Sequence, residues 1–491
     1  MNSKLFLGLR SLQVEEYPRW EAFLHSSYHT THGNSPSCWE YLKAYAPEFS
    51  TDLIQLEALH TFLFPDRTFH RQRVLDEISH LYQSLKRFWE MEALRQDPLL
   101  QRTLRLRQIS ERKLDRIYSV ERKAAQRMLE EEHAQQEVFY QTQLAWTTID
   151  NEHFGRQQLR TVDESLSNKL QALDLFYLVQ MLRESCEALN RQHILNTQYE
   201  IVLLPAILEL LNQLTHPYRR IPLVAVYLQI YQSLQASASD ETYECLLATL
   251  REYRAHFSRQ EQRAMYKFAQ NFCIRKINEG QGAYDHRLFD LFREVLAEGI
   301  LFTDGNLSHT DCKNITTIGL RVKELDWVER FLGESGHKVD LEFRENVLAY
   351  CRASLEAERG HPQKAIRLLS QISHTDVHYQ LSARQLLLKI YYYEEDIEGV
   401  LYTIDSFRHF LQRNKEIPKS RRDYHLRFLN LFKRLSLLRE RVSTYSPTKA
   451  QEQIRQLRER LIASDSLANR GWLEEEITAL QVDTPILESL Y

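Results

Sequence analysis

Apolar residues recur at three- and four-residue steps along most of the chain, which is the period of an α-helix with one buried face. The clearest stripe is Val74, Ile78, Leu81, Leu85 and Phe88. Similar stripes predict helices over residues 15–24, 38–45, 51–63 and 68–94, and again over 172–189, 199–214, 221–234, 241–255, 259–278, 284–298 and 310–323. Only 13 Gly and 12 Pro interrupt 491 residues. The pattern therefore predicts an all-α protein.

Polar residues at the ends of these stripes mark helix boundaries. Ser258 followed by Glu261 has capping-box spacing, and Ser446 before Pro447 predicts another helix start. Residues 301–309, with an Asp304-Gly305 turn, are expected to form an inserted loop.

One short pattern returns twice between residues 325 and 410. Leu325-Asp326-Trp327, Gly360-His361-Pro362 and Glu395-Asp396-Ile397 are expected to be equivalent turns, 35 residues apart both times. This spacing is within one residue of the period of tetratricopeptide repeats, in which pairs of antiparallel helices stack on their neighbours. The chain is therefore similar to such repeats in its C-terminal half.

The middle copy matches best. Ala365 follows Gly360 by five residues and is small enough for a close helix approach, and Ala353 is a second small residue on the preceding helix. We predict that Ala365 lies at a helix–helix contact and that Glu356 is exposed. By the same register, Arg330 stands at the place of Ala365 in the first copy.

The predicted organisation has four parts: a helical N-terminal domain (1–97), charged connecting helices (98–162), a tetratricopeptide-like α-solenoid of antiparallel helix pairs (163–440), and C-terminal helices with a tail (441–491). Gly471-Trp472 is expected to interrupt the last part.

Composition narrows the setting. The net charge of −4 gives no global attraction to nucleic acid or to an anionic membrane. The six cysteines are scattered singly, which favours buried free thiols in a reducing compartment. No stretch approaches the ~20 apolar residues of a membrane span. These features predict a cytoplasmic protein without a membrane contact.

Catalytic and metal-binding signals are weak. The chain has no P-loop, no dinucleotide fingerprint, no zincin motif and no nucleophile elbow, so we expect no enzyme and no cofactor. His25, His29 and His32 near Cys38 are one conceivable metal cluster, but they lie in a polar stretch expected to be a loop, and solvent-exposed histidines are the preferred interpretation.

Two stretches are rich in basic residues. From residue 99 to 160 the arginines precede acidic residues, which favours helices with surface charge pairs over a nucleic-acid site. From 408 to 439, ten basic residues accompany only Glu416 and Asp423. The candidate ligand-binding patch in this second stretch consists of Arg408, Arg413, Lys415, Lys419, Arg421, Arg422 and Arg427.

Aromatic residues within the second stretch have two interpretations. They could stack on nucleic-acid bases if exposed. Alternatively, Phe428, Leu431, Phe432 and Leu435 form a core stripe at helical spacing, which leaves the arginines on a solvated outer face.

Three segments resemble an uncharacterised family of all-helical proteins from Bacteroidetes-type bacteria: residues 186–195 (CEALNRQHIL), 271–278 (NFCIRKIN) and 405–429 (DSFRHFLQRNKEIPKSRRDYHLRFL). The resemblance extends over nearly the whole chain, including Tyr17, Trp20 and Phe23. It implies a helical architecture in a bacterial cytosol and assigns no functional residue.

Two functional classes remain open on the sequence. A helical-repeat surface predicts a non-catalytic scaffold that binds a protein or peptide. The alternative is binding of nucleic acid or an acidic ligand through residues 408–439.

Overall fold

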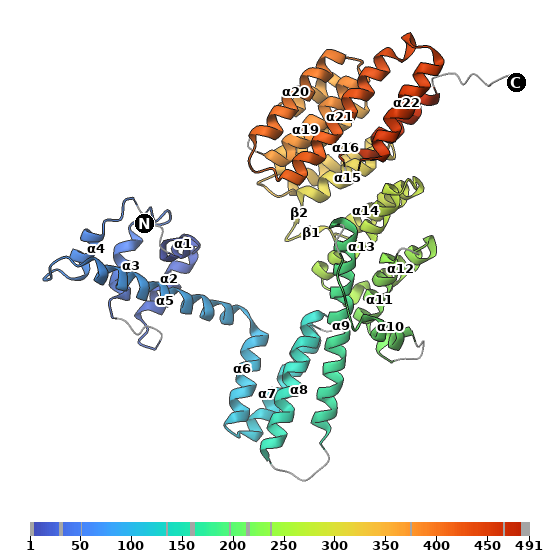
Figure 1. The fold of residues 1–491 in the computed structure, drawn as a ribbon. Helices are drawn as coiled ribbons and strands as arrows, with labels where there is room; N and C mark the ends of the chain where they lie inside the picture. The colour runs from blue at the N-terminus through green and yellow to red at the C-terminus, as the bar shows by residue number, and fades with distance from the viewer. Residues whose placement is uncertain are drawn as a thin grey trace. The chain divides into compact units, whose positions relative to one another are not determined.

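A computed structural model describes residues 4–28, 33–50, 52–133, 136–157, 163–195, 198–212, 217–235, 238–373, 376–464 and 467–482. It is about 80% helical, with 23 α-helices and one two-stranded hairpin in these residues (Figure 1). The all-α prediction is confirmed. The chain divides into two compact units, one up to Tyr177 and one from Leu178, and each is described by itself.

The first unit begins with five helices around one core: α1 (Lys4–Arg10), α2 (Tyr17–His25), α3 (Ser35–Lys43), α4 (Leu56–Leu63) and α5 (Arg71–Gln96). The predicted stripe from Val74 to Phe88 is buried on α5. Helix α1 was not predicted, because its apolar residues are too few to show a period. Its residue Gly8 lies so close to α5 that a Cβ there would be 2.7 Å from Leu85.

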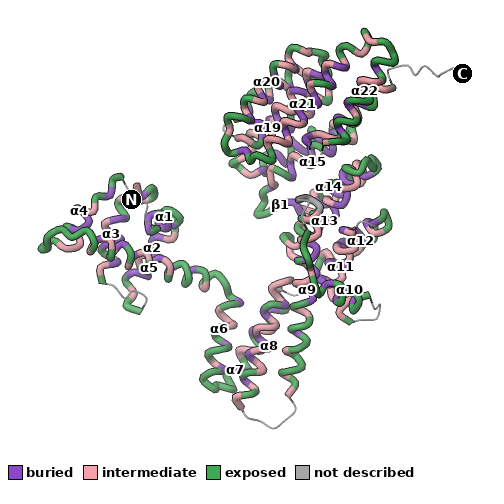
Figure 2. The backbone as a smooth tube through the Cα atoms, viewed as in Figure 1, coloured by how far each residue is buried: buried purple, intermediate pink, exposed green. Residues whose placement is uncertain are grey.

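Three further helices of the first unit form a helical hairpin layer: α6 (Pro98–Glu111), α7 (Asp115–His133) and α8 (Glu137–Gln157). Asp97 caps α6 by accepting a hydrogen bond from the Leu100 amide at 2.8 Å, with Pro98 at the first helical position. Leu106, Ala125 and Trp146 are buried between these helices, while their other faces are exposed (Figure 2).

Helix α9 (Glu164–Leu195) runs through the division between the units. The second unit continues with α10 (Leu204–Asn212), α11 (Pro222–Leu234), α12 (Asp240–Tyr253), α13 (Arg259–Asn278), α14 (Ala283–Ala297), β1 (Phe302–Thr303), β2 (Asn306–Leu307), α15 (His309–Arg321), α16 (Leu325–Ser335), α17 (Arg344–Glu358), α18 (Pro362–Leu369), α19 (Val377–Tyr393), α20 (Ile397–Arg413), α21 (Lys419–Arg441), α22 (Pro447–Ile462) and α23 (Arg470–Val482).

Local signals place several of these boundaries correctly. The capping box of Ser258 and Glu261 is present at the start of α13, whose predicted bounds are exact. The Ser446 hydroxyl accepts from the Lys449 amide at the start of α22. The expected inserted loop is the β1–β2 hairpin, in which Asp304 and Gly305 both have positive φ.

The same turn joins two helices at four places in the second unit, and it also ends α14 at Gly299. In each, the chain leaves a helix through one residue with positive φ: Gly280 (86°), Lys323 (63°), Gly360 (74°) and Glu395 (58°). The amide of the next residue donates to a carbonyl five residues back, and the pairs are Gln281 to Lys276, Glu324 to Gly319, His361 to Glu356, and Asp396 to Tyr391, at 2.9–3.0 Å. This is the Schellman motif. It joins α13 to α14, α15 to α16, α17 to α18, and α19 to α20.

The turns correct the predicted register of the first copy. Lys323, and not Leu325, is equivalent to Gly360 and Glu395, so the intervals between the last three turns are 37 and 35 residues. The residue equivalent to Ala365 is therefore Val328 and not Arg330. The sequence pattern does not reveal this shift, because the residue with the left-handed conformation is a lysine, whereas a glycine would have marked the turn.

Small residues permit close packing within these helix pairs. Ala365 and Ala353 are fully buried, as are Val328 and Val400 at the positions equivalent to Ala365. A Cβ at Gly319 would lie 2.5 Å from a Val328 methyl group. The predicted burial of Ala365 is confirmed.

The predicted exposure of Glu356 is wrong. Its side chain is 20% exposed, accepts a hydrogen bond from His361 Nδ1 at 2.7 Å and lies 3.7 Å from Lys364 Nζ. Glu356 therefore stabilises the turn between α17 and α18 through these contacts.

Helix α23 packs on α19 and α21 as well as on the preceding α22. The Trp472 ring stacks on Phe432 of α21 at 5.3 Å, and its Nε1 donates to Tyr393 Oη of α19 at 2.8 Å. One apolar core extends from α19 through α23. Gly471-Trp472 lies inside α23 and does not interrupt it, because Trp472 is a packing residue of the helix.

Candidate functional site

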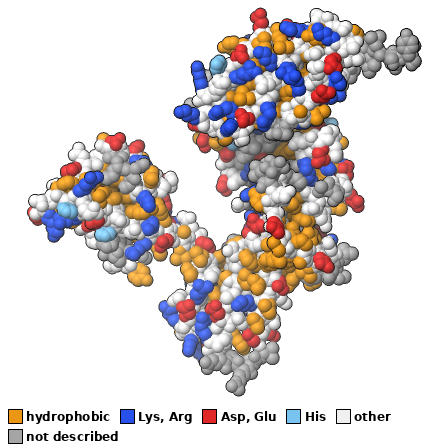
Figure 3. Space-filling view, viewed as in Figure 1, with side chains coloured by type: hydrophobic (Ala, Val, Ile, Leu, Met, Phe, Trp, Pro, Cys, Tyr) orange, Lys and Arg blue, Asp and Glu red, His pale blue; other side chains and the backbone are white. Residues whose placement is uncertain are grey.

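The seven residues of the predicted patch lie on α20, α21 and the connection between them, but they do not form one surface. Lys and Arg side chains are frequent on this part of the molecule, with Asp and Glu among them (Figure 3). Four of the seven, Arg413, Lys415, Lys419 and Arg421, are exposed, and the other three are half-buried. The contacts of Arg408, Arg421, Arg422 and Arg427 are described below.

A surface cleft of about 1050 Å³ takes up part of the patch. Arg413 and Lys415 line it at the end of α20, opposite Arg384 of α19. Arg384 Nη1 donates to Ser406 Oγ at 3.2 Å, and its guanidinium lies 4.7 Å from the Phe410 ring centre. Burial lowers the pKa of Arg384, and no ion pair joins it to a carboxylate of the described residues.

The cleft is lined by three Lys and Arg side chains and by two acids. His409 is also in its lining, and Asp405 and Glu416 are the acids there. Arg384 lies 24 residues before the basic stretch in the sequence, so inspection of that stretch alone could not include it. A half-buried cation such as Arg384, without a carboxylate partner, makes the cleft a candidate anion-binding site.

Other members of the patch have structural contacts. Arg422 donates to the carbonyl oxygens of Asn414 and Ile417, which fastens the connection between α20 and α21. Arg408 donates to Asn430 Oδ1 at 2.8 Å and lies 3.6 Å from Asp405. Arg427 is half-buried on α21.

The aromatic residues are core residues. Phe428, Leu431, Phe432 and Leu435 are buried, which confirms the core-stripe interpretation. Phe407 is buried as well, and Phe410 and Tyr424 are half-buried. The stretch consequently offers no row of exposed rings on which bases could stack.

Arg421 belongs to a different surface. It donates to His378 Nδ1 of α19 at 3.3 Å. On α15, Lys313 Nζ donates to Ser382 Oγ of α19 at 2.8 Å and lies 5.0 Å from the Tyr350 ring centre of α17. We call these five side chains the first-helix face. They come from α15, α17 and α19, which are the first helices of pairs joined by the repeated turn, and from α21, which is the next helix along the chain after these pairs.

The first-helix face is electropositive. Burial lowers the pKa of Lys313, and Arg421 adds to the effect. Burial, followed by the charges of Lys313 and Arg421, also lowers the pKa of His378. The nearby Asp376 is used as the cap of α19, where it accepts from the Tyr379 amide at 3.0 Å, and it also accepts from Asn346 Nδ2 at 2.9 Å.

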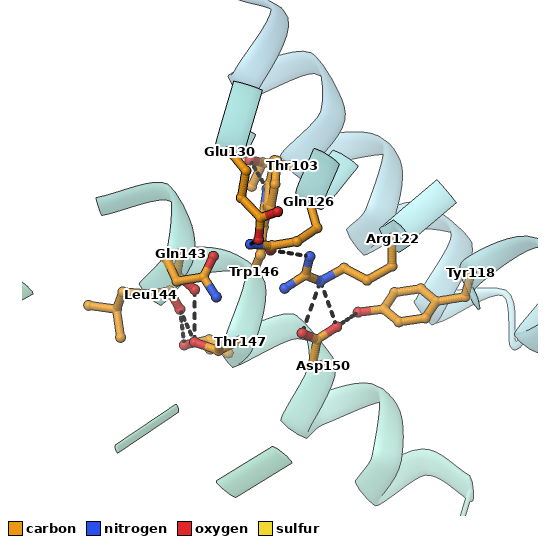
Figure 4. Close-up of polar contacts among 11 residues, drawn as sticks. Thr103, Tyr118, Arg122, Gln126, Glu130, Gln143, Leu144, Trp146, Thr147 and Asp150 are labelled. Atoms are coloured by element: carbon orange, nitrogen blue, oxygen red, sulfur yellow. Dashed lines mark hydrogen bonds and ion pairs between the residues drawn. The ribbon is translucent and has the colours of Figure 1, made fainter. Parts of the chain in front are cut away.

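The arginines of the first basic stretch are held in structural networks. Arg122 Nε donates to both oxygens of Asp150, at 2.9 and 3.1 Å, and Tyr118 Oη donates to the same carboxylate at 2.6 Å (Figure 4). Arg122 also donates to Gln126 and lies 5.3 Å from the Trp146 ring. These contacts support the interpretation of residues 99–160 as a charged structural layer.

The remaining candidate chemistry is sparse. His25 is exposed, while His29 and His32 lie outside the described residues. The described ranges contain no group of three or more His, Cys, Asp or Glu side chains arranged for a metal ion. Five cysteines are buried and Cys245 is exposed, and none of the described helices has the length and apolar character needed to cross a bilayer.

Comparison with known proteins adds no assignment: no protein-family model, no curated protein and no solved structure matches the chain.

Proposed function

We propose that this protein is a non-catalytic scaffold of stacked helix pairs that binds a protein or peptide partner. One observation carries the proposal: the turns at Gly280, Lys323, Gly360 and Glu395, each of which joins two helices, share one geometry. A repeated turn gives successive helix pairs a similar orientation, which favours a solenoid with a continuous surface along its first helices. The tetratricopeptide resemblance and a bacterial cytosolic setting belong to the same proposal.

Side-chain contacts across three helices support a continuous surface. Lys313 of α15 reaches Tyr350 of α17 and Ser382 of α19. A surface shared by several repeats suits an extended peptide or a helix better than a small substrate, because such ligands contact several units at once.

The test is site-specific photo-crosslinking of the full chain in its native host. A photoreactive residue replaces Thr317, which is exposed one helical turn after Lys313 on α15; the control replaces Gln363, which is exposed on α18. We expect discrete protein adducts from position 317 and none from 363. Equal adducts from both positions, or none from 317, would overturn the scaffold proposal.

A second candidate function is binding of nucleic acid or another polyanion at the cleft. It is favoured by Arg384, whose charge has no carboxylate partner there, beside Arg413 and Lys415. Retention on heparin at moderate salt tests this candidate, with a steep salt dependence expected if the cleft binds phosphates or sulfates.

The informative variant is Arg413→Ala with Lys415→Ala, because substitution of Arg422 would also disturb the connection that it fastens. The matched control is Lys123→Ala with Arg127→Ala, which removes two exposed charges from α7. Retention that is lost only in the first variant supports the cleft. Equal losses in both variants eliminate it.

A further inference from the structure

The first-helix face continues along α15 and α19 to Arg321, Lys389 and Tyr393, which contact helix α23. We call this end the occupied part and the end with Lys313 and Arg421 the open part, and the occupied part indicates what the open part binds. Helix α23 lies near the C-terminal ends of α15 and α19. There, Arg321 Nη2 is 3.5 Å from a Glu475 oxygen, and Tyr393 Oη donates to Glu476 Oε1 at 2.6 Å. The cation of Lys389 lies 4.9 Å from the Trp472 ring.

The occupied part thus binds an acidic helix through an ion pair, a hydrogen bond and a cation–π contact. Carboxylates of α23 meet an arginine and a tyrosine hydroxyl, and its tryptophan covers a lysine. Residues 472–476 of α23 read WLEEE, so the ligand segment combines one large aromatic side chain with adjacent acids.

The open part lies toward the N-terminal ends of the same helices and has the same residue types. Lys313 and Arg421 supply two cations, and the half-buried Tyr350 supplies an aromatic ring whose centre is 5.0 Å from the Lys313 ammonium. The Tyr379 ring, 5.8 Å from the same ammonium, is fully buried behind it. His309 Nδ1 is 2.9 Å from Tyr379 Oη, which fixes that ring from the side of α15.

Charges at the open part are not balanced. No ion pair joins Lys313 or Arg421 to a carboxylate in the described part of the chain, whereas Arg321, in the occupied part, has Asp285 at 2.8 Å in addition to Glu475. Lys313 Nζ uses one donor for Ser382 Oγ and an ammonium group has three. Two cations that converge from α15 and α21 without an acid form a site for an anion.

We propose that the open part of the first-helix face binds an acidic peptide segment of a partner protein, with its carboxylates on Lys313 and Arg421. The proposal deepens the scaffold function, on which it rests for the identity of the ligand as a protein. It commits to side-chain carboxylates because these are the groups that the occupied part of the face already binds.

The test uses fluorescence anisotropy of the full chain with a labelled peptide of ten glutamates at low salt, beside a peptide of ten glutamines. We expect binding of the glutamate peptide only. The double variant Lys313→Met with Arg421→Gln removes two charge-assisted contacts and is expected to weaken binding roughly tenfold or more.

The matched control is Arg413→Gln with Lys415→Gln, which removes the same charge from the cleft. We expect it to weaken binding less than about threefold, by general electrostatics alone. Equal weakening in the two double variants would overturn the proposal. Arg421→Gln alone, an exposed substitution on α21, keeps the test decisive if Lys313→Met disturbs folding.

A phosphorylated peptide provides the remaining arm. If a ten-residue phosphoserine peptide binds through Lys313 and Arg421 and the glutamate peptide does not, the commitment to carboxylates is overturned. The outcome of this test is distinguishable from that of the crosslinking at position 317. Adducts at position 317 without binding of the glutamate peptide would support the scaffold function and overturn the acidic-peptide site. Binding of the glutamate peptide without adducts would support an anion site and overturn the scaffold function.

Discussion

The layer of α6, α7 and α8 and the helix pairs from α15 to α21 both carry many basic residues and ion pairs, but Arg122 of the first region and Arg384 of the second differ in their partners. In the first region Arg122 is bound to Asp150 and Gln126. In the second, the helices are held by apolar contacts such as Gly319 against Val328, and Arg384 has no carboxylate partner in the described structure. A run of basic residues therefore predicts a binding surface only where the fold supplies no acids to it.

The largest expected effect is loss of the network in the first region. Asp150→Ala leaves Arg122 and Tyr118 without their shared acceptor in a partly buried site, so we expect the free energy of unfolding to fall by about 3–4 kcal/mol. Urea unfolding followed by circular dichroism measures it. Lys123→Ala, an exposed change on the same helix as Arg122, is expected to lie within about 0.5 kcal/mol of the wild type. Equal effects of the two changes would show that the network is not structural.

The second prediction concerns His425, which is one of two buried histidines with different neighbours. His153 of α8 lies 3.3 Å from Asp115. His425 Nδ1 of α21 instead accepts a hydrogen bond from Gln385 Nε2 at 2.9 Å, and the positive charge of Arg421 is nearby. Burial, and then the charge of Arg421, lowers the pKa of His425 from 6.5 to about 4. The imidazole is thus neutral in the folded protein near pH 7.

The sign of the pH effect follows from this shift. Between pH 6.5 and 4 the unfolded state binds a proton that the folded state does not, so His425 destabilises the fold progressively as the pH falls through this window. We expect a loss of about 2 kcal/mol between pH 7 and pH 5. His425→Gln should remove this part of the pH dependence in urea unfolding. An unchanged difference between the two pH values would contradict it.

How much the sequence predicts depends on whether a feature has a local signal. The helix from Arg259 to Asn278 has the bounds that the sequence predicts, because a capping box begins it and glycines follow it. The turn at Lys323 was misplaced by two residues, because its positive φ has no glycine to mark it. The basic stretch was found by composition, but Lys313 and Arg384 were missed, since only tertiary packing brings them to Arg421 and Arg413.

The third prediction tests whether apolar packing maintains the second region. Ala365→Leu adds volume to a fully buried position between α17 and α18, and should cost ~1–2 kcal/mol through overpacking. Ala365→Val should cost less, because Val328 and Val400 occupy the equivalent positions. The matched control is Gln363→Leu, which introduces the same side chain at an exposed position of α18.

Thermal melting and limited proteolysis of these variants give the measurement. We expect the cleavage pattern of Ala365→Leu to change in α15–α20, since each helix pair packs against its neighbours. If Ala365→Leu and Gln363→Leu melted alike, Ala365 would tolerate a larger side chain and the close contact of α17 with α18 would not be required.

The smallest expected effect completes the comparison. Arg413→Ala and Lys415→Ala remove exposed side chains for which no described residue supplies an ion-pair partner, so the free energy of unfolding should change by less than about 0.5 kcal/mol. Arg122→Ala in the first region should instead cost several times more, because it leaves the Asp150 carboxylate with the Tyr118 hydroxyl but without its cation. Urea unfolding of the three variants in one buffer measures their free energies of unfolding and allows them to be compared. If Arg413→Ala were as costly as Arg122→Ala, the cations of the second region would be structural too, and their lack of acidic partners would no longer indicate a ligand.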